Sequence, residues 1–131
     1  MTWVDALAGF LVAHMVGDYL FQTDWQARHK RGGLTGDGTS RRALWTHVTT
    51  YTLAFLPVLI WMGAEAGAWV GILAGVLIFV PHLIIDDGRV VDVYLERVKR
   101  ADARTVGLAT SVDQALHVVC LWAVALLAGL S

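Results

Sequence analysis

The sequence predicts an all-α membrane protein: a four-helix transmembrane bundle with an amphipathic cytoplasmic helix after the third span. Three observations support this fold class. Hydrophobic residues make up 56% of the 131 residues and charged residues 16%, whereas soluble domains carry about 25% charged residues. Four segments are long and apolar enough to cross the hydrocarbon core, which takes about 20 residues. Every Lys and Arg lies in two connections between these segments.

The predicted spans form one integral membrane domain, residues 1–131. They are residues 3–23, 43–64, 66–86 and 108–130. Between the third and fourth spans, Val91, Tyr94, Leu95 and Val98 follow helical spacing among charged residues. This pattern is typical of an amphipathic helix that lies on the inner membrane surface or caps the bundle. The glycine-rich connection KRGGLTGDGTSRR, residues 30–42, is predicted to be a mobile loop.

The basic residues also predict the orientation. They fall within residues 28–42 and 89–104, Arg104 included, while residues 63–67 and both termini carry none. Connections rich in Lys and Arg stay in the cytoplasm. We therefore expect a multi-pass protein of the inner (plasma) membrane with both termini outside the cytoplasm. The single cysteine excludes an intramolecular disulfide and a Cys-rich zinc site, and we expect the lipid bilayer as a partner and no nucleic acid.

Ionisable residues interrupt every span. Positions four apart differ by only about 40° around a helix, so pairs with this spacing face the same way. The alternating direction of the spans brings all of these side chains to one layer in the cytoplasmic half of the bundle. They are His14, Asp18, His47, His82, Asp86, Asp113 and His117.

Imidazole nitrogens and carboxylate oxygens at matched depth predict a metal site. Seven ligands exceed the four of tetrahedral zinc and suit two divalent ions about 3.5–4 Å apart. We expect zinc first, with manganese or iron as alternatives for the same mixed N/O ligands. Gln22 and Gln114 are predicted to donate hydrogen bonds to the ligating carboxylates from a second shell.

A metal-dependent hydrolase is the leading functional hypothesis, with its catalytic groups unassigned. Arg41, Arg42 and Arg89 lie at the same membrane face and could bind the anionic head group of a lipid or a lipid-linked phosphate. An ion or proton transport module is the first alternative, because intramembrane Asp and His also form relays. The second is a non-enzymatic interaction protein stapled by metal. A bundle of four helices is thin, and a homodimer is compatible with it.

Four motifs resemble a family of small bacterial and phage membrane proteins classed only as a domain of unknown function. They are HMVGDYLFQTDWQARHK, the histidine of LWTHV, HLIIDDGR and DQALH. The resemblance covers most of the chain and selects His14, Gly17, Asp18, Gln22, His47, His82, Asp86, Asp113, Gln114 and His117. Arg89 stands where the family commonly has Lys. The layout is also similar to small inner-membrane proteins labelled metal-dependent hydrolases, which implies a metal cofactor and a hydrolytic reaction.

Overall fold

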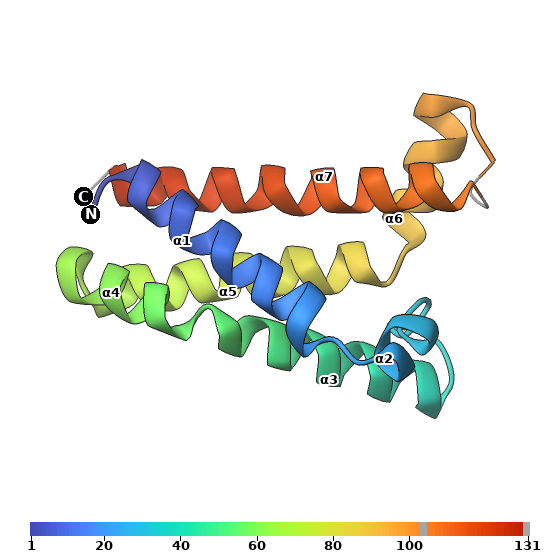
Figure 1. Cartoon of the computed structure of the whole chain (residues 1–131), viewed down its shortest axis with the longest axis horizontal. Helices are drawn as coiled ribbons and strands as arrows, with labels where there is room; N and C mark the ends of the chain where they lie inside the picture. Colours follow the sequence, from blue (N-terminus) through green and yellow to red (C-terminus); the bar gives the residue numbers. More distant parts are fainter. Residues whose placement is uncertain (103–104, 130–131) are drawn as a thin grey trace.

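The computed structural model describes residues 1–102 and 105–129, and it confirms the all-α bundle. Figure 1 shows the long helices lying lengthwise against one another, with the N-terminus and the last described residues at the same end. Arg104 and residue 130, the predicted end of the fourth span, lie outside the described residues. In chain order the elements are α1 (Trp3–Met15), η1 (Val16–Phe21), α2 (Asp24–His29), α3 (Gly38–Ala54), α4 (Leu56–Ala66), α5 (Ala68–Asp86), α6 (Arg89–Tyr94), η2 (Leu95–Lys99), α7 (Val106–Ala125) and η3 (Leu126–Gly129).

Among the described residues, three helical segments are long and apolar enough to span a membrane, and the second predicted span differs from them. The three are Trp3–Phe21, Ala68–Asp86 and Gly107–Gly129, while α3 and α4 form a fourth span only as a pair bent by 52°. The helix breaks at Phe55 because Pro57 has no N–H to donate to the carbonyl of Leu53, and in an unbroken helix its ring would clash with that carbonyl. Residues 43–64, predicted from hydropathy as one span, therefore consist of parts of two helices joined at a bend.

Capping residues define where the first three helices begin. The Thr2 hydroxyl accepts a hydrogen bond from the Asp5 N–H, and the Asp5 carboxylate accepts one from the Thr2 N–H. Thr23 begins α2 with the same reciprocal pattern. Asp37 caps α3 through the backbone N–H of Ser40, and this hydrogen bond holds the pKa of the Asp37 carboxyl below its ordinary value. Such caps satisfy backbone donors that the first helical turn leaves free.

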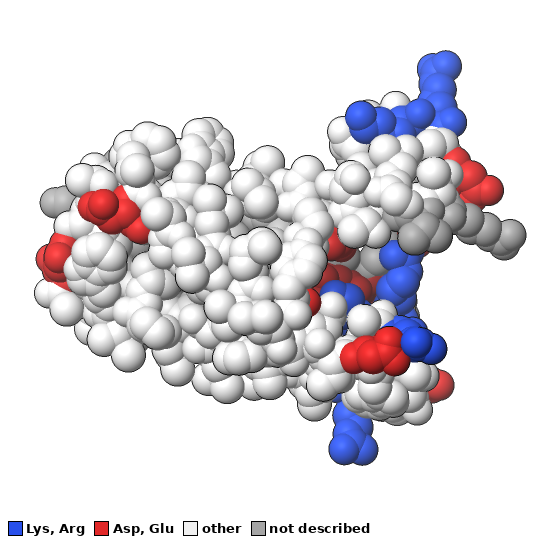
Figure 2. All heavy atoms as spheres, viewed as in Figure 1, with Lys and Arg blue, Asp and Glu red and all other residues white. Residues whose placement is uncertain are grey.

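The two ends of the bundle differ in chemistry. Phe10, Phe55 and Met62 are fully buried in an apolar core in the half that carries the termini. Figure 2 shows the Lys and Arg side chains gathered at the opposite end. Large apolar side chains along the outside, such as Leu20 and Trp69 at 75% and 78% exposed, are compatible with contact to lipid.

The amphipathic segment after α5 packs over the basic end of the bundle. Val91 and Leu95 are buried in one cluster with Ile85 and Val112, whereas Val98 is 61% exposed. The glycine-rich connection predicted to be mobile begins directly after α2 and consists of a short turn followed by the first turn of α3. The Gly32 N–H donates to the backbone oxygen of Asp87 at 2.8 Å and attaches this turn to the end of α5.

Candidate metal centre

Four histidines, one from each spanning segment, lie in one buried layer. They are His14 in α1, His47 in α3, His82 in α5 and His117 in α7, and none is more than 2% exposed. The His82 ring centroid lies 5.2 Å from that of His47 and 4.4 Å from that of His117. The alternating direction of the helices therefore brings the four rings together near the basic end.

Two carboxylates enter this layer between the imidazole rings. Asp18 Oδ1 lies 3.3 Å from His47 Nε2 and 3.7 Å from His82 Nε2. Asp86 Oδ2 lies 2.8 Å and 3.1 Å from the same two nitrogens, which are themselves 3.2 Å apart. Asp18 lies in the π-helical turn η1, and such turns are frequent at functional sites.

The spacing of these atoms suits coordination of an ion. Nitrogen and oxygen ligands at the corners of a zinc tetrahedron lie about 3.3 Å apart, given bonds of about 2.0–2.1 Å. In the part of the chain that the structure describes, two groups have ligand atoms all within 4.8 Å of one another: Asp18, His47 and His82, and His82, Asp86 and His117. Each group contains two imidazoles and one carboxylate, and three protein ligands leave a coordination position open for water or substrate. The structure thus positions His and Asp groups that could hold a metal ion.

Several candidate ligand atoms are buried without a hydrogen bond. Asp18 Oδ1, Asp86 Oδ1 and His117 Nε2 have no hydrogen-bond partner within the described part of the chain. A buried polar atom left in this way costs about 1–3 kcal/mol. Asp18 Oδ1 belongs to the first three-residue group, whereas Asp86 Oδ1 and His117 Nε2, 3.6 Å apart, belong to the second. A cation bound at each group would satisfy these atoms.

His117 is held with its Nε2 facing the centre. Its Nδ1 bonds to the backbone oxygen of Asp113 at 2.9 Å, so Nδ1 carries the proton and Nε2 offers a lone pair. That Nε2 lies 3.6 Å from Asp86 Oδ1. The Asp113 carboxylate lies 3.5 Å from Nδ1, on the other side of the ring, and is 26% exposed. Asp113 therefore orients His117 and belongs to neither three-residue group.

His14 uses both ring nitrogens for hydrogen bonds and also lies outside the two groups. Nδ1 bonds to the Tyr51 hydroxyl and Nε2 to Gln114 Oε1, each at 3.0 Å. The Tyr51 ring in turn stacks on His82 with 3.5 Å between centroids and 10° between planes. Tyr51 thus positions two histidines, a role that the sequence did not reveal because a single tyrosine inside a span is an ordinary packing residue.

The two glutamines occupy different positions. Gln114 Nε2 donates to Asp113 at 3.2 Å and to Asp18 at 3.5 Å, and its Oε1 accepts from the Tyr19 hydroxyl at 3.1 Å. Gln114 therefore supports a candidate ligand carboxylate, Asp18. Gln22 Nε2 is buried without a hydrogen-bond partner among the described residues.

Lys30 is a site residue that sequence reasoning missed. Its ammonium donates to Asp86 Oδ2 at 2.8 Å, and its side chain is only 16% exposed. The buried Asp87 carboxylate holds the loop after Lys30 in place, because it accepts a hydrogen bond from the Leu34 N–H at 2.8 Å. It also pairs with Arg89 Nε at 3.2 Å. The two adjacent aspartates of HLIIDDGR could have indicated that another segment docks here, since a second buried carboxylate needs hydrogen-bond partners of its own.

The Arg31 side chain lines the same cavity as Lys30 and lies against Gly88, in the turn after α5. Gly88 has a φ of +88°, and a Cβ there would lie 2.8 Å from Arg31 Cζ, so only glycine fits without displacing the guanidinium. Arg31 Nη2 donates to Asp92 Oδ1 at 2.6 Å. The turn after α5 is therefore shaped around Arg31.

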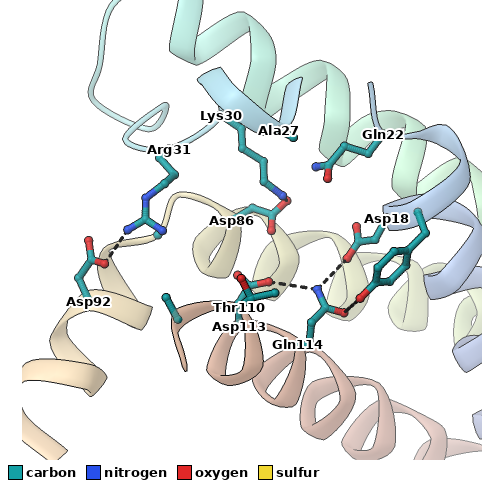
Figure 3. Close-up of a pocket in the computed structure, with 13 residues that line it drawn as sticks. Asp18, Gln22, Ala27, Lys30, Arg31, Asp86, Asp92, Thr110, Asp113 and Gln114 are labelled. Atoms are coloured by element: carbon teal, nitrogen blue, oxygen red, sulfur yellow. Dashed lines mark hydrogen bonds and ion pairs between the residues drawn. The ribbon is translucent and has the colours of Figure 1, made fainter. Parts of the chain in front are cut away.

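A cavity of about 830 Å³ leads from this end of the protein to the carboxylates. Its lining includes Asp18, Gln22, Lys30, Arg31, Asp86 and Asp113. In Figure 3 these side chains project into one space between α2, α5 and α7, and Figure 2 shows carboxylate and cationic atoms inside a recess at this end. The candidate metal centre is thus open to the basic face of the bundle.

The three arginines expected to bind a head group lie elsewhere in the structure. Arg41 Nη2 donates to the Gly36 carbonyl, and Arg42 lies over the Trp25 ring at 5.9 Å. Arg89 pairs with Asp87 and donates to the Thr35 hydroxyl. None of these three lines the 830 Å³ cavity, whose cations among the described residues are Lys30 and Arg31.

Fold and site together define a helical membrane protein with a buried His/Asp cluster. A protein-family model described as "Protein of unknown function (DUF3307)" matches residues 6–131. The chain therefore belongs to this family, in agreement with the resemblance in its motifs. No curated protein and no solved structure gave a match to the chain.

Proposed function

We propose that this protein is a metal-dependent hydrolase of the membrane, acting on a phosphate- or ester-containing substrate at the level of the lipid head groups. One observation carries the proposal: four potential ligand atoms of Asp18, His47, His82 and Asp86 converge at five distances of 2.8–3.7 Å. The two carboxylates among them, Asp18 and Asp86, line an open cavity. A purely structural cluster has no need of such an opening.

The residues of the site have separate tasks in this proposal. His47 and His82, with the carboxylates of Asp18 and Asp86, bind a divalent ion, with zinc expected first and manganese or iron as alternatives. The ion supplies Lewis-acid polarisation and activation of water. In hydrolysis the water oxygen bonds to the phosphorus or acyl carbon, the bond to the leaving oxygen breaks, and a water proton ends on the leaving alcohol. His117 remains available beside Asp86 for a second ion.

Charge supports a location of the site at the cytoplasmic face. The Lys and Arg residues gather at the end where the cavity opens (Figure 2), and cytoplasmic connections carry such an excess. Both termini would then face away from the cytoplasm of an inner (plasma) membrane. A substrate anchored in the inner leaflet would present its polar group at the cavity mouth.

The packing favours hydrolysis over transport. Phe10, Phe55 and Met62, all fully buried, fill the centre of the half that carries the termini. A transport module needs polar groups along the whole path, because charge in an apolar medium is costly. The metal-stapled interaction protein differs from the hydrolase only in turnover, so an assay decides between these two.

Metal analysis of the detergent-purified protein tests the proposal. The wild type should retain metal in stoichiometric amount, and Asp86→Asn and His82→Ala should lose most of it and lose hydrolysis. Asp24→Asn is the matched control, because the Asp24 carboxylate is 76% exposed and pairs with Arg28 outside the centre. A wild-type protein without stoichiometric metal refutes the proposal. Bound metal without turnover on phosphate or carboxylic esters in vesicles favours the stapled interaction protein.

A further inference from the structure

We infer that Gln22, Lys30 and Arg31 form a phosphoryl-binding subsite beside the metal centre, so that the substrate is a phosphate ester. This inference rests on the proposed function, because it names the substrate class of the same site. The three side chains line the cavity that contains Asp18 and Asp86. Figure 3 shows them on the wall formed by the chain between η1 and α3, where Lys30 extends to Asp86 and Arg31 points to Asp92.

Gln22 gives the most specific indication of a ligand. Its Nε2 is buried and has no hydrogen-bond partner in the part of the chain that the structure describes. An unsatisfied donor of this kind destabilises the free protein by about 1–3 kcal/mol. A donor that lines a cavity and lacks a protein acceptor is suited to an oxygen of a bound molecule.

Lys30 connects this wall to the metal centre. Its Nζ lies 2.8 Å from Asp86 Oδ2, and that oxygen is 3.1 Å from His82 Nε2. An oxygen atom of a substrate bound at the centre would therefore lie close to the ammonium. Lys30 is a positioning residue for both the ligand carboxylate and the incoming substrate.

Arg31 adds a planar pair of donors at the mouth of the cavity. Its present partner is Asp92, and the two side chains are 53% and 35% exposed. A pair this exposed is worth little in free energy, so the guanidinium can exchange it for a better acceptor. Arg binds phosphate in a two-pronged manner that its geometry favours.

The cationic donors of the subsite favour phosphate over a carboxylic ester. A carboxylic ester is neutral and offers Lys30 and Arg31 no charge to exchange for their present carboxylate partners, Asp86 and Asp92. A phosphoryl group carries one or two negative charges and several acceptor oxygens, which match a metal ion together with Lys and Arg. The lining carboxylates Asp18, Asp86, Asp92 and Asp113 do not exclude it, because a divalent ion together with Lys30 and Arg31 balances their four charges.

Binding of inorganic phosphate to the metal-loaded protein in lipid-free detergent tests this inference. Arg31→Gln and Gln22→Met should each weaken binding about tenfold or more, as expected for loss of a hydrogen bond to a charged group. Arg28→Gln is the matched control, since it removes the same charge from the same segment, where Arg28 pairs with the exposed Asp24. Gln22→Met should also unfold at the same or a higher temperature than the wild type, because it removes an unpartnered donor.

Two competitors identify the source of the phosphoryl group. If vesicles containing phosphatidic acid displace phosphate and glycerol phosphate does not, the subsite takes a lipid head group; the reverse result assigns a soluble phosphate ester. Either result supports a phosphoryl subsite. If the protein retains its metal but Arg31→Gln and Gln22→Met bind phosphate as tightly as Arg28→Gln, the inference is wrong while the metal centre stands. Absence of phosphate binding by metal-loaded wild type overturns it as well.

Discussion

Replacing Gly17 by alanine should disturb the metal centre from outside it. A Cβ at this position would lie 2.5 Å from Tyr51 Cδ2, 3.1 Å from Cγ and 3.2 Å from the Tyr51 Cα. Carbon atoms in contact are about 3.5–4.0 Å apart, so the ring must retreat by roughly 1 Å. It has no room to do so, since Tyr51 is 1% exposed and stacks on His82 at 3.5 Å.

Overpacking of this kind costs about 1–3 kcal/mol, and the better helix propensity of alanine returns at most about 1 kcal/mol. We therefore expect Gly17→Ala to lower the free energy of unfolding by roughly 1–2 kcal/mol and to retain less metal, because the Tyr51 ring carries its displacement to His82. Thermal unfolding in detergent and metal analysis measure the two effects.

Gly107→Ala is the control for this prediction. A Cβ at Gly107, in the first turn of α7, would meet nothing within 4 Å, so this variant should be as stable as the wild type or slightly more so. The packing account is refuted if Gly17→Ala matches Gly107→Ala in both unfolding temperature and metal content.

Three further predictions concern the loop, the ion and the orientation. Asp87→Ala should lower the free energy of unfolding by about 1.5–3 kcal/mol, because it removes the buried acceptor of the Leu34 N–H; chemical denaturation measures the loss, and a wild-type value contradicts it. Chelation should lower the unfolding temperature and added metal should restore it, since an ion at 100 times its Kd contributes about 2.7 kcal/mol; an unchanged temperature argues against a bound ion. In a Cys120→Ala background, a membrane-impermeant thiol reagent should label Ala64→Cys but not Thr39→Cys in intact cells, and the opposite pattern reverses the orientation.

The helices and the polar layer could be predicted from sequence because both depend on local spacing. Runs of about 20 apolar residues identify spans by length alone. Likewise, His82 and Asp86, four residues apart in α5, face one way in any straight helix. Antiparallel neighbours then bring such pairs to the same depth, which required no knowledge of side-chain contacts.

Features that depend on contacts between distant segments could not be predicted in this way. Lys30 and Asp86 are far apart in sequence, and their ion pair requires a loop docked by Asp87. A glycine-rich polar stretch gives no periodic signal of such docking, so its composition alone indicated a mobile loop. The bend at Phe55 was not predicted for a different reason. A hydropathy pattern contains no information on the backbone hydrogen bond that Pro57 removes.

The geometry of the site also indicates how many metal ions it can hold. The seven ligands predicted from the sequence had suggested two ions. The two candidate groups share His82, and His82 Nε2 is the atom that lies among His47, Asp18 and Asp86. One nitrogen lone pair serves one ion, so a central ion on His47 and His82 takes His82 away from the second group. Among the described ligands, Asp86 Oδ1 and His117 Nε2 then remain, 3.6 Å apart, and two protein ligands hold an ion less tightly than three. We therefore expect one tightly held ion, with any second ion bound weakly and favoured by a phosphate ester that supplies the missing oxygen ligands.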